Sequence, residues 1–599
     1  MDKFNQNKRK IIIIALVFAI LCVISLSAVV IRNATAVSGN WDSYVSSTLN
    51  KDSGGYYKIT TPEDFAKCNA YSGTYYKSGA KLRLYANIDM SAHYWTPRTF
   101  YGELDGNGFT IKKLHVGENS SKPTDESVGI FSTIDGANIH DVIISSATIY
   151  GYKFSGALAG YSKGSTIIQN VQCSGNYVYA FNNSDKSSSS YYCGGIVGYL
   201  YGGSITNGKV RNGACYTRNK DANYTNATIY SGGVVGYAYS GTITKCYSIG
   251  TYIRAGYNSG TTYANSVYAG GIVGRSSINI SSCFSQSAYI YGATSSSSST
   301  VNNSYAGGIA GYCGAEINSC FNKSLVYSYA KDQQTTSGSV TTKYSNAKAG
   351  GICGAGATVK NCYNTGSVTG GKQTKTYDVK FSTTKQRGES RGSATWTSNH
   401  TEKVYGTITI TSAKYCDDIQ PSTTSFTNCY GTNSYFTDDA SFDLSSSYTC
   451  GGAYNTGENG TKNGTFSYKA SNVGYLDVTK TGNTNGIAKA IVGTQNFHGT
   501  NLSWNYYQNI RVKIVYNSTS LKIDFLYDYQ SGYLSSAQEK SEAILSDSGF
   551  NRTVKYTVKT VNELKNVNMG SSFATDSKIN GGLPYIKDFY WKDNAVKPN

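Results

Sequence analysis

Short aliphatic clusters framed by glycines recur along the middle of the chain, and Ser, Thr, Asn and Tyr fill the intervals between them. Counted at the central aliphatic residue, successive clusters are 28, 38, 38, 38, 37 and 43 residues apart. A fixed period of this length indicates a repeat architecture. The aligned clusters occupy residues 128–131, 156–160, 194–198, 232–236, 270–274, 307–311 and 350–354.

A second pattern follows each cluster after seven to ten residues. It consists of an aliphatic residue, two intervening residues, and a small or apolar residue. The pairs are Ile139/Val142, Ile168/Val171, Ile205/Gly208, Ile243/Cys246, Ile280/Cys283, Ile317/Cys320 and Val359/Cys362, with Phe426/Cys429 as a degenerate eighth copy. Each repeat therefore holds two or three short strands, which cannot enclose a core until copies stack on one another.

Stacked repeats predict a β-solenoid whose successive coils pair in parallel, about 4.8 Å apart. Equivalent residues then lie above one another and form a buried aliphatic ladder. An α-helical repeat is improbable, because each glycine costs about 1 kcal/mol within a helix. The predicted ladder consists of Ile130, Leu158, Ile196, Val234, Ile272, Ile309 and Ile352.

The repeats and their flanking segments resemble the GLUG repeat, found in bacterial surface adhesins and in the non-catalytic part of IgA-cleaving metallopeptidases. Residues 232–250 show the arrangement most fully, and residues 59–65, 86–90, 95–97 and 102–111 resemble that family's usual start. Residues 579–585 resemble its usual end. The resemblance implies a right-handed parallel β-helix exposed at a cell surface. It implies no activity.

The predicted fold is therefore all-β: a right-handed parallel β-helix with short capping helices and a β-rich C-terminal insertion. Helix-start signals lie at Thr61 with Asp64, at Ser536 with Glu539, and at Thr560 with Glu563. The first should cap the open end of the solenoid. The predicted parts are residues 1–36 (export segment), 37–127 (N-terminal cap and first coils), 128–370 (repeats), 371–555 (irregular coils and inserted module) and 556–599 (last coil and C-terminal cap).

The amino terminus predicts export. Four basic residues precede an uncharged apolar run over residues 11–31, and Ala34-Thr35-Ala36 has the form of a signal-peptidase site. The run is also long enough to span a bilayer, so cleavage after Ala36 and retention as a membrane anchor both stay open. Either outcome places the rest of the chain outside the cytoplasm, with membrane contact only through an uncleaved segment.

Net charge of +18 favours anionic partners such as cell-wall polymers or acidic glycans. Nucleic acid is not an expected partner, because charged residues make up only 15% of the chain. The one extended basic run, residues 372–391, is interpreted as a loop, with a solvated loop of no function as the alternative.

The sequence contains no recognisable catalytic or metal motif. Its five histidines do not form His-Glu-x-x-His, and its cysteines do not form Cys-x-x-Cys, so neither a zinc peptidase centre nor any other metal or cofactor is expected. Cys246, Cys283, Cys320 and Cys362 share one ladder position. We interpret them as buried thiols, although bridges between stacked neighbours stay open. Asp105 is interpreted as a turn residue.

The candidate binding residues lie in variable loops before each glycine pair, over residues 181–192, 217–231, 257–268, 294–305 and 331–348. Tyrosine offers amphipathic contact area, and Ser, Asn and Gly offer adaptable hydrogen bonds. Spacer loops without a ligand are the alternative. The candidates are Tyr191, Tyr192, Tyr224, Tyr230, Tyr257, Tyr263, Tyr268, Tyr305 and Tyr344, with Lys372, Lys375, Arg387 and Arg391 in the basic run.

These features predict a non-enzymatic surface protein that acts in adhesion by presenting Tyr, Ser and Asn side chains to glycans or to host or neighbouring proteins. Two alternatives stay open. One is an extracellular polysaccharide lyase or hydrolase on a β-helix scaffold, and the other is a structural surface spacer. A compact ionisable cluster would favour the enzyme, and a broad aromatic and hydroxyl face would favour the adhesin.

Overall fold

A computed structural model describes the chain over residues 37–117, 125–181, 189–219, 227–256, 264–294, 303–338, 340–391, 394–412, 415–421, 426–433, 439–455, 461–470, 475–480, 495–496, 507–516, 520–530, 539–546 and 556–587. The predicted export segment, residues 1–36, lies outside these residues. No helix within the described ranges is long and apolar enough to cross a bilayer.

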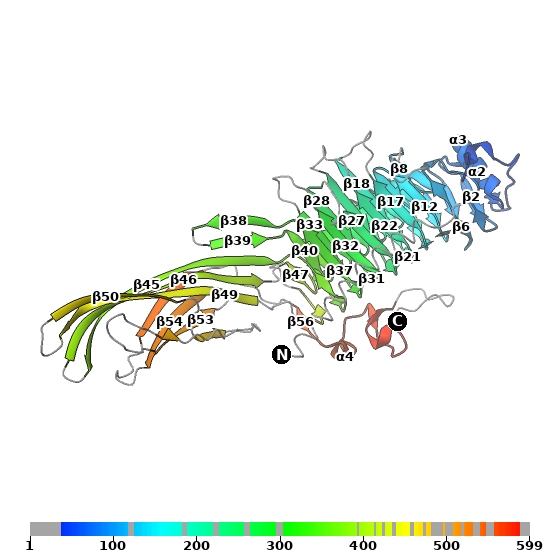
Figure 1. Ribbon diagram of the computed structural model, residues 1–599. Helices are drawn as coiled ribbons and strands as arrows, with labels where there is room; N and C mark the ends of the chain where they lie inside the picture. Colours follow the sequence, from blue (N-terminus) through cyan, green and yellow to red (C-terminus); the bar gives the residue numbers. More distant parts are fainter. Residues whose placement is uncertain are drawn as a thin grey trace.

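The body of the molecule is a parallel β-helix, which confirms the predicted all-β solenoid (Figure 1). Each complete coil contributes one short strand to each of five sheets, and equivalent strands of successive coils pair in parallel. Sheet 1 contains β1 (Tyr57–Ile59), β2 (Lys81–Leu84), β5 (Glu103–Asp105), β10 (Asn138–His140), β15 (Ile167–Gln169), β20 (Ser204–Thr206), β25 (Thr242–Thr244), β30 (Ile280–Ser281), β35 (Glu316–Asn318) and β42 (Thr358–Lys360).

The second and third sheets follow along each coil. Sheet 2 contains β3 (Ile88–Asp89), β6 (Thr110–Lys112), β11 (Ile143–Ser145), β16 (Gln172–Ser174), β21 (Lys209–Arg211), β26 (Tyr247–Ile249), β31 (Phe284–Gln286), β36 (Phe321–Asn322), β43 (Tyr363–Asn364), β48 (Tyr430–Gly431) and β56 (Thr557–Val558). Sheet 3 contains β7 (His115–Val116), β12 (Thr148–Gly151), β17 (Tyr177–Phe181), β22 (Ala214–Arg218), β27 (Tyr252–Gly256), β32 (Tyr289–Thr294), β37 (Val326–Ala330) and β44 (Val368–Thr369).

The last two sheets complete the coil. Sheet 4 contains β8 (Ser127–Val128), β13 (Phe154–Gly156), β18 (Ser190–Gly194), β23 (Thr228–Gly232), β28 (Ser266–Gly270), β33 (Asn303–Gly307), β40 (Ala347–Gly350) and β47 (Cys416–Asp417). Sheet 5 contains β4 (Arg98–Phe100), β9 (Phe131–Asp135), β14 (Ala159–Lys163), β19 (Val197–Leu200), β24 (Val235–Ala238), β29 (Val273–Ser276), β34 (Ala310–Cys313) and β41 (Cys353–Ala355).

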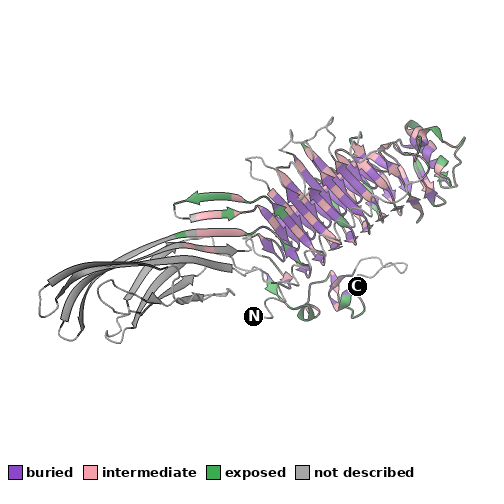
Figure 2. Ribbon diagram, in the orientation of Figure 1, coloured by how far each residue is buried: buried purple, intermediate pink, exposed green. Residues whose placement is uncertain are grey.

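The core runs through the coils as continuous columns (Figure 2). All seven residues of the predicted aliphatic ladder are fully buried, and the main-chain N–H of Val234 donates to the Ile272 carbonyl of the next coil at 2.9 Å. The predicted cysteine column is also buried, and its thiols are unbridged. The N–H of Cys246 donates to the Cys283 thiol at 3.4 Å, and the same contact repeats at the next two coils.

The amino-terminal end of the solenoid carries three short helices (Figure 1): η1 (Trp41–Ser43), α2 (Pro62–Ala70) and α3 (Ser72–Tyr75). Helix α2 begins with the predicted capping box, in which the Asp64 N–H donates to the Thr61 hydroxyl. Phe65 of this helix stacks on Trp95 at 5.0 Å between ring centroids. The helix therefore joins the core at the end of the solenoid, as the predicted cap requires.

Further strands, antiparallel to their neighbours except for residues 475–480 and 511–516, which pair in parallel, follow the last coils (Figure 1). The basic run predicted as a loop is instead mostly strand, because residues 373–391 pair along their whole length with residues 394–412. The helix predicted from Ser536 is also wrong over residues 539–546, which form a strand. The strands are β38 (Gln333–Ser337), β39 (Val340–Tyr344), β45 (Gln373–Arg391), β46 (Ala394–Ser412), β49 (Asp439–Asn455), β50 (Thr461–Ala470), β51 (Tyr475–Lys480), β52 (Gln495–Asn496), β53 (Tyr507–Tyr516), β54 (Ser520–Gln530) and β55 (Glu539–Ser546).

The C-terminal segment, residues 561–586, folds back onto the outer face of sheet 2. It contains α4 (Val561–Leu564), β57 (Phe573–Ala574), η3 (Asn580–Gly582) and β58 (Tyr585–Ile586), and α4 begins with the predicted capping box at Thr560 and Glu563. Its apolar residues cover a stack of four aromatic rings, which we call the single ladder. The single ladder consists of Tyr247, Phe284, Phe321 and Tyr363.

Candidate functional site

Two columns of aromatic side chains run side by side along the outer faces of sheets 4 and 5, and we call them together the double ladder. The side chains of each column come from equivalent positions of successive coils. The sheet 4 column is Phe154, Tyr192, Tyr230, Tyr268 and Tyr305. The sheet 5 column is Tyr161, Tyr199, Tyr237, Arg275 and Tyr312.

The parallel pairing of the strands sets the spacing of these rings. Along sheet 4 the centroids of Tyr192, Tyr230, Tyr268 and Tyr305 are 4.8, 5.3 and 5.0 Å apart, and neighbouring rings are within 9° of parallel. Such distances match the separation of paired strands and the preferred range for aromatic contacts. The ring faces are therefore used within the column, and a ligand can reach the edges of the partly exposed rings, Tyr192, Tyr268 and Tyr305.

Glycines bring the two columns together. A Cβ on Gly236 would lie 2.8 Å from the Cys193 nitrogen of sheet 4, and a Cβ on Gly274 would lie equally close to the Ser231 nitrogen. The sheet 5 backbone thus packs directly against the sheet 4 backbone, an approach that only glycine permits. As a result, the rings of Tyr230 and Tyr237 stack across the two sheets at 5.2 Å.

Strand alternation decides which predicted tyrosines reach this surface. Tyr192, Tyr268 and Tyr305 are partly exposed, whereas Tyr230 is 5% exposed. Tyr191 was predicted as a binding residue, and that prediction is wrong, because its side chain is fully buried in the core. Successive side chains of a strand point to opposite faces, so Tyr191 faces inward where its neighbour faces outward.

The other predicted binding residues lie elsewhere. Tyr224, Tyr257 and Tyr263 are outside the described residues. Tyr344 is half-buried on β39, where it pairs with Gln333 and Gln373 in the antiparallel sheet rather than in the double ladder. In the basic run, Lys372 is exposed and Lys375 is half-buried, while Arg387 and Arg391 lie on β45.

Sequence reasoning missed the sheet 5 column. Its members directly follow the last glycine of each repeat cluster, as in Gly198-Tyr199 and Gly236-Tyr237. The recurrence of an aromatic residue at that one position was the available signal. Beyond the column, Tyr201 and Tyr239 stack at 5.2 Å and are 47% and 49% exposed, so they extend the aromatic surface.

Burial shapes the electrostatics of this surface. It raises the pKa of the Tyr305 phenol to about 12, and Tyr268 and Tyr312 add to the effect. Burial also raises the pKa values of Tyr192 and Tyr230. These hydroxyls therefore stay protonated at physiological pH and can both donate and accept hydrogen bonds.

An ionisable cluster lies on the outer face of sheet 1, in the first coils. The Nε of Arg83 donates to Asp105 at 2.7 Å, and the His140 ring nitrogens lie 2.9 Å from Asp141 and 3.3 Å from Glu103. Burial opposes protonation of His140, but its hydrogen bonds to these carboxylates outweigh it, so the pKa of His140 is raised.

We interpret this cluster as an ion-pair network rather than as a metal site or an acid–base site. Asp105, His140 and Asp141 each offer one ligand atom, and these atoms lie within 4.8 Å of one another. Arg83 already pairs with Asp105, however, and a guanidinium beside a ligand opposes a second cation. Asp105 also accepts from the Asn107 N–H at 2.8 Å, which fits its predicted turn role.

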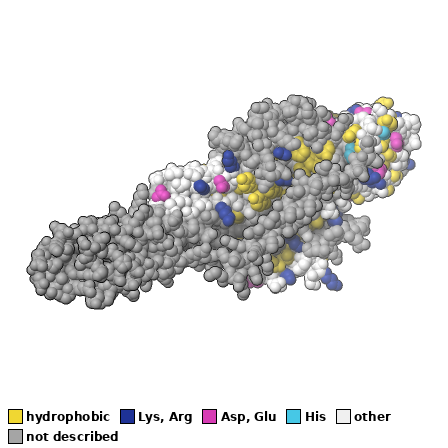
Figure 3. All heavy atoms as spheres, in the orientation of Figure 1, with side chains coloured by type: hydrophobic (Ala, Val, Ile, Leu, Met, Phe, Trp, Pro, Cys, Tyr) yellow, Lys and Arg dark blue, Asp and Glu magenta, His cyan; other side chains and the backbone are white. Residues whose placement is uncertain are grey.

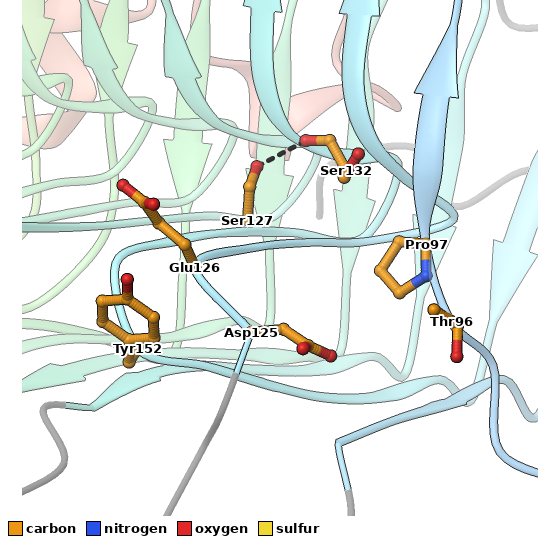
Figure 4. A pocket seen from close by; sticks show the side chains of 7 residues that line it. All are labelled: Thr96, Pro97, Asp125, Glu126, Ser127, Ser132 and Tyr152. Carbon is orange, nitrogen blue, oxygen red and sulfur yellow. Dashed lines mark hydrogen bonds between the residues drawn. The ribbon is translucent and has the colours of Figure 1, made fainter. Parts of the chain in front are cut away.

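A cavity of about 320 Å³ opens beside the first strands of sheet 4 (Figure 4). Its lining includes two carboxylates, Asp125 and Glu126, which point to opposite sides of the chain in Figure 4. Lys153 pairs with Glu126 at 2.7 Å. Paired carboxylates that act on one glycosidic bond must converge on it, so this arrangement does not favour the hydrolase alternative.

Comparisons of the chain with models of known protein families, with curated proteins and with solved structures found no match. The resemblance of the repeats to the GLUG repeat therefore stays a prediction.

Proposed function

We propose that this chain is an exported surface protein that binds glycans along the double ladder. One observation carries the proposal: nine aromatic rings stand in two registered columns over five coils, and most of them are partly exposed. A rigid periodic surface of this kind suits an extended polymer, which can meet the same group at each coil.

The geometry of the rings indicates which chemical groups a ligand would need. Because the ring faces stack on one another, a ligand meets ring edges and phenol hydroxyls. Hydroxyl-rich chains such as polysaccharides can exchange hydrogen bonds with each phenol in turn, and their apolar C–H patches can contact the ring edges. A glycan is thus favoured over an apolar peptide, which would leave the hydroxyls without partners.

The arrangement of the described ionisable groups favours binding over catalysis. In the described ionisable cluster, Asp105 and His140 already form ion pairs with neighbouring side chains. In the described cavity, the carboxylates of Asp125 and Glu126 point away from each other. A lyase or hydrolase would need convergent groups that include an acid or base with a suitable pKa. Export follows from the predicted signal segment and is part of the proposal.

The test is a glycan array run beside a depolymerisation assay on the purified full-length chain at about physiological salt, which limits nonspecific charge attraction. A variant with Tyr201→Ser and Tyr239→Ser removes two half-exposed rings from the surface. We expect the wild type to bind glycan saturably and this variant to bind about tenfold more weakly, because each substitution removes a hydrogen bond and contact area.

The matched control carries Tyr252→Ser and Tyr329→Ser, which remove rings of similar exposure from sheet 3. It should bind like the wild type. Saturable binding only to proteins, or to no glycan, would contradict the proposal. New reducing or unsaturated ends would contradict it in favour of the enzyme.

A further inference from the structure

One rung of the double ladder is arginine instead of tyrosine. Arg275 occupies the sheet 5 position that Tyr237 and Tyr312 hold in the adjacent coils. Its guanidinium carbon lies 5.5 Å from the ring centroids of Tyr237 and Tyr268, and 5.2 Å from that of Tyr312. Three aromatic rings therefore hold this cation by cation–π contacts.

The guanidinium has hydrogen-bonding capacity to spare. Over the part of the chain that the structure describes, no carboxylate forms an ion pair with Arg275, and its buried Nε lacks a hydrogen-bond partner. The phenol groups of Tyr230, Tyr237 and Tyr268 interact with the guanidinium, and none of them carries a negative charge at physiological pH. A guanidinium has five N–H donors in a planar fork, a geometry that matches an oxyanion.

Arginines in the first coils are satisfied differently. Arg83 pairs with Asp52 and Asp105, and Arg98 pairs with Asp42 at 2.6 Å. These guanidinium groups have their anions within the fold. Arg275 has aromatic neighbours in place of an anion, so its charge is available to a ligand.

The coils around Arg275 contain more basic than acidic residues. From residue 142 to residue 315 the sequence contains ten Lys or Arg residues and two acidic ones, Asp185 and Asp221, both outside the described residues. On sheet 4, Lys348 occupies the position that follows Tyr305 in the next coil, and its ammonium lies 5.8 Å from the Tyr305 ring centroid. Figure 3 shows hydrophobic patches with Lys and Arg side chains beside them on one face of the solenoid.

From these contacts we infer that Arg275 binds an oxyanion of an acidic polysaccharide lying along the double ladder. The inference rests on the proposed function and narrows it to anionic glycans. The guanidinium fork binds the carboxylate or sulfate of one sugar unit. The tyrosine hydroxyls of the neighbouring coils bind the hydroxyls of the flanking units.

The test uses Arg275→Tyr, which makes the sheet 5 column continuous and should fold, since tyrosine fills the equivalent position of the neighbouring coils. Polygalacturonate, its methyl-esterified neutral form and dextran sulfate are the probes. We expect polygalacturonate to bind the wild type saturably and the variant about tenfold more weakly, the effect of losing a charge-assisted hydrogen bond. Binding of the esterified polymer should not change.

Arg254→Tyr is the matched control, because Arg254 lies over Tyr291 at 5.0 Å on sheet 3 and the substitution changes the same charge. Its affinity for polygalacturonate should stay within about twofold of the wild type, because removing a charge that salt screens has a small effect on binding. Equal losses in both variants would overturn the inference by showing diffuse charge attraction. A loss confined to dextran sulfate supports it with sulfate as the oxyanion.

Failure of this inference is distinguishable from failure of the proposed function. If acidic and esterified polymers bind equally well and Arg275→Tyr changes neither, the inference is wrong and glycan binding stands. If no glycan binds the wild type, the proposed function itself is wrong.

Discussion

The single ladder and the double ladder use the same stacking but differ in what covers them. In the single ladder Phe284 and Phe321 stack at 4.8 Å, and all four rings are at most 2% exposed beneath the C-terminal segment. In the double ladder the spacing is similar, yet most rings keep a partly exposed edge. Stacking alone therefore does not determine whether a ladder is core or surface.

The residue types at the ring edges explain the difference. The centre of the single ladder is phenylalanine, whose apolar edges meet the aliphatic and aromatic side chains of residues 564–586. Its two tyrosines have hydroxyl partners: Arg211 donates to Tyr247 at 2.9 Å, and Tyr363 donates to the Pro584 carbonyl at 2.6 Å. The double ladder consists almost entirely of tyrosine, which suits contact with water or a polar ligand.

The largest expected effect comes from Phe321→Ala, because it opens a cavity in the fully buried single ladder. It should reduce the free energy of unfolding by about 3–5 kcal/mol. Tyr199→Ala in the half-buried double ladder should cost only about 1–2 kcal/mol. Urea unfolding followed by circular dichroism measures both values. Equal costs would show that the two ladders are equally part of the core.

Gly270→Ala should damage the double ladder alone. A Cβ at this position would lie 1.8 Å from the Val273 carbonyl oxygen, so the corner between sheets 4 and 5 must open. We expect a loss of about 3 kcal/mol, the upper range for an overpacked site, with a loss of near-ultraviolet tyrosine signal. Gly73→Ala, which meets nothing within 4 Å, is the control and should be neutral. An unchanged tyrosine signal in Gly270→Ala would disprove the role of the glycine corner.

Tyr363→Phe should loosen the cover of the single ladder without creating a cavity. It removes the bond to Pro584 and the one accepted from the Asn580 side chain, which costs about 1 kcal/mol. Limited proteolysis should then cleave residues 561–586 faster than in the wild type. Tyr312→Phe in the double ladder should leave that rate unchanged, and equal acceleration by both variants would refute the distinction.

Alkaline pH should give the smallest effect. Burial raises the pKa of Tyr305 to about 12 and that of Tyr363 still further. Because an unfolded tyrosine ionises near 10, the stability from each protonated phenol is present below pH 10 and is lost as pH rises through the folded value. Tyr305→Phe should therefore make stability fall less steeply above pH 10, as measured by thermal unfolding. An unchanged slope would contradict the raised pKa.

The sequence was sufficient to predict the coils and their core. Glycine pairs and aliphatic residues recur at one position, and Cys246 with its equivalents recurs at another, so period and burial were both readable. The choice between Tyr191 and Tyr192 was not readable, because a one-residue shift of a strand reverses which side chain faces outward. The strand at residues 373–391 could not be predicted either, because its structure depends on pairing with residues 394–412.

The cover of the single ladder was beyond sequence reasoning for a different reason. Tyr363 bonds to residues more than 200 positions away, and no periodic pattern connects the C-terminal segment to sheet 2. The sheet 5 tyrosines were visible as a recurrence, but only the glycine contacts reveal that they adjoin the sheet 4 column. Long-range packing, rather than local pattern, thus decided the candidate site.

The cysteine column has a consequence for how the chain matures. All twelve cysteines whose side chains the structure describes are buried and unbridged, and burial raises the pKa of the Cys246, Cys283 and Cys320 thiols. Thiolates are the species that oxidise and exchange, so these sulfurs are shielded from redox chemistry once the coils close. The solenoid should therefore reach its native form without oxidative folding catalysts and keep its stability in reducing and oxidising surroundings alike.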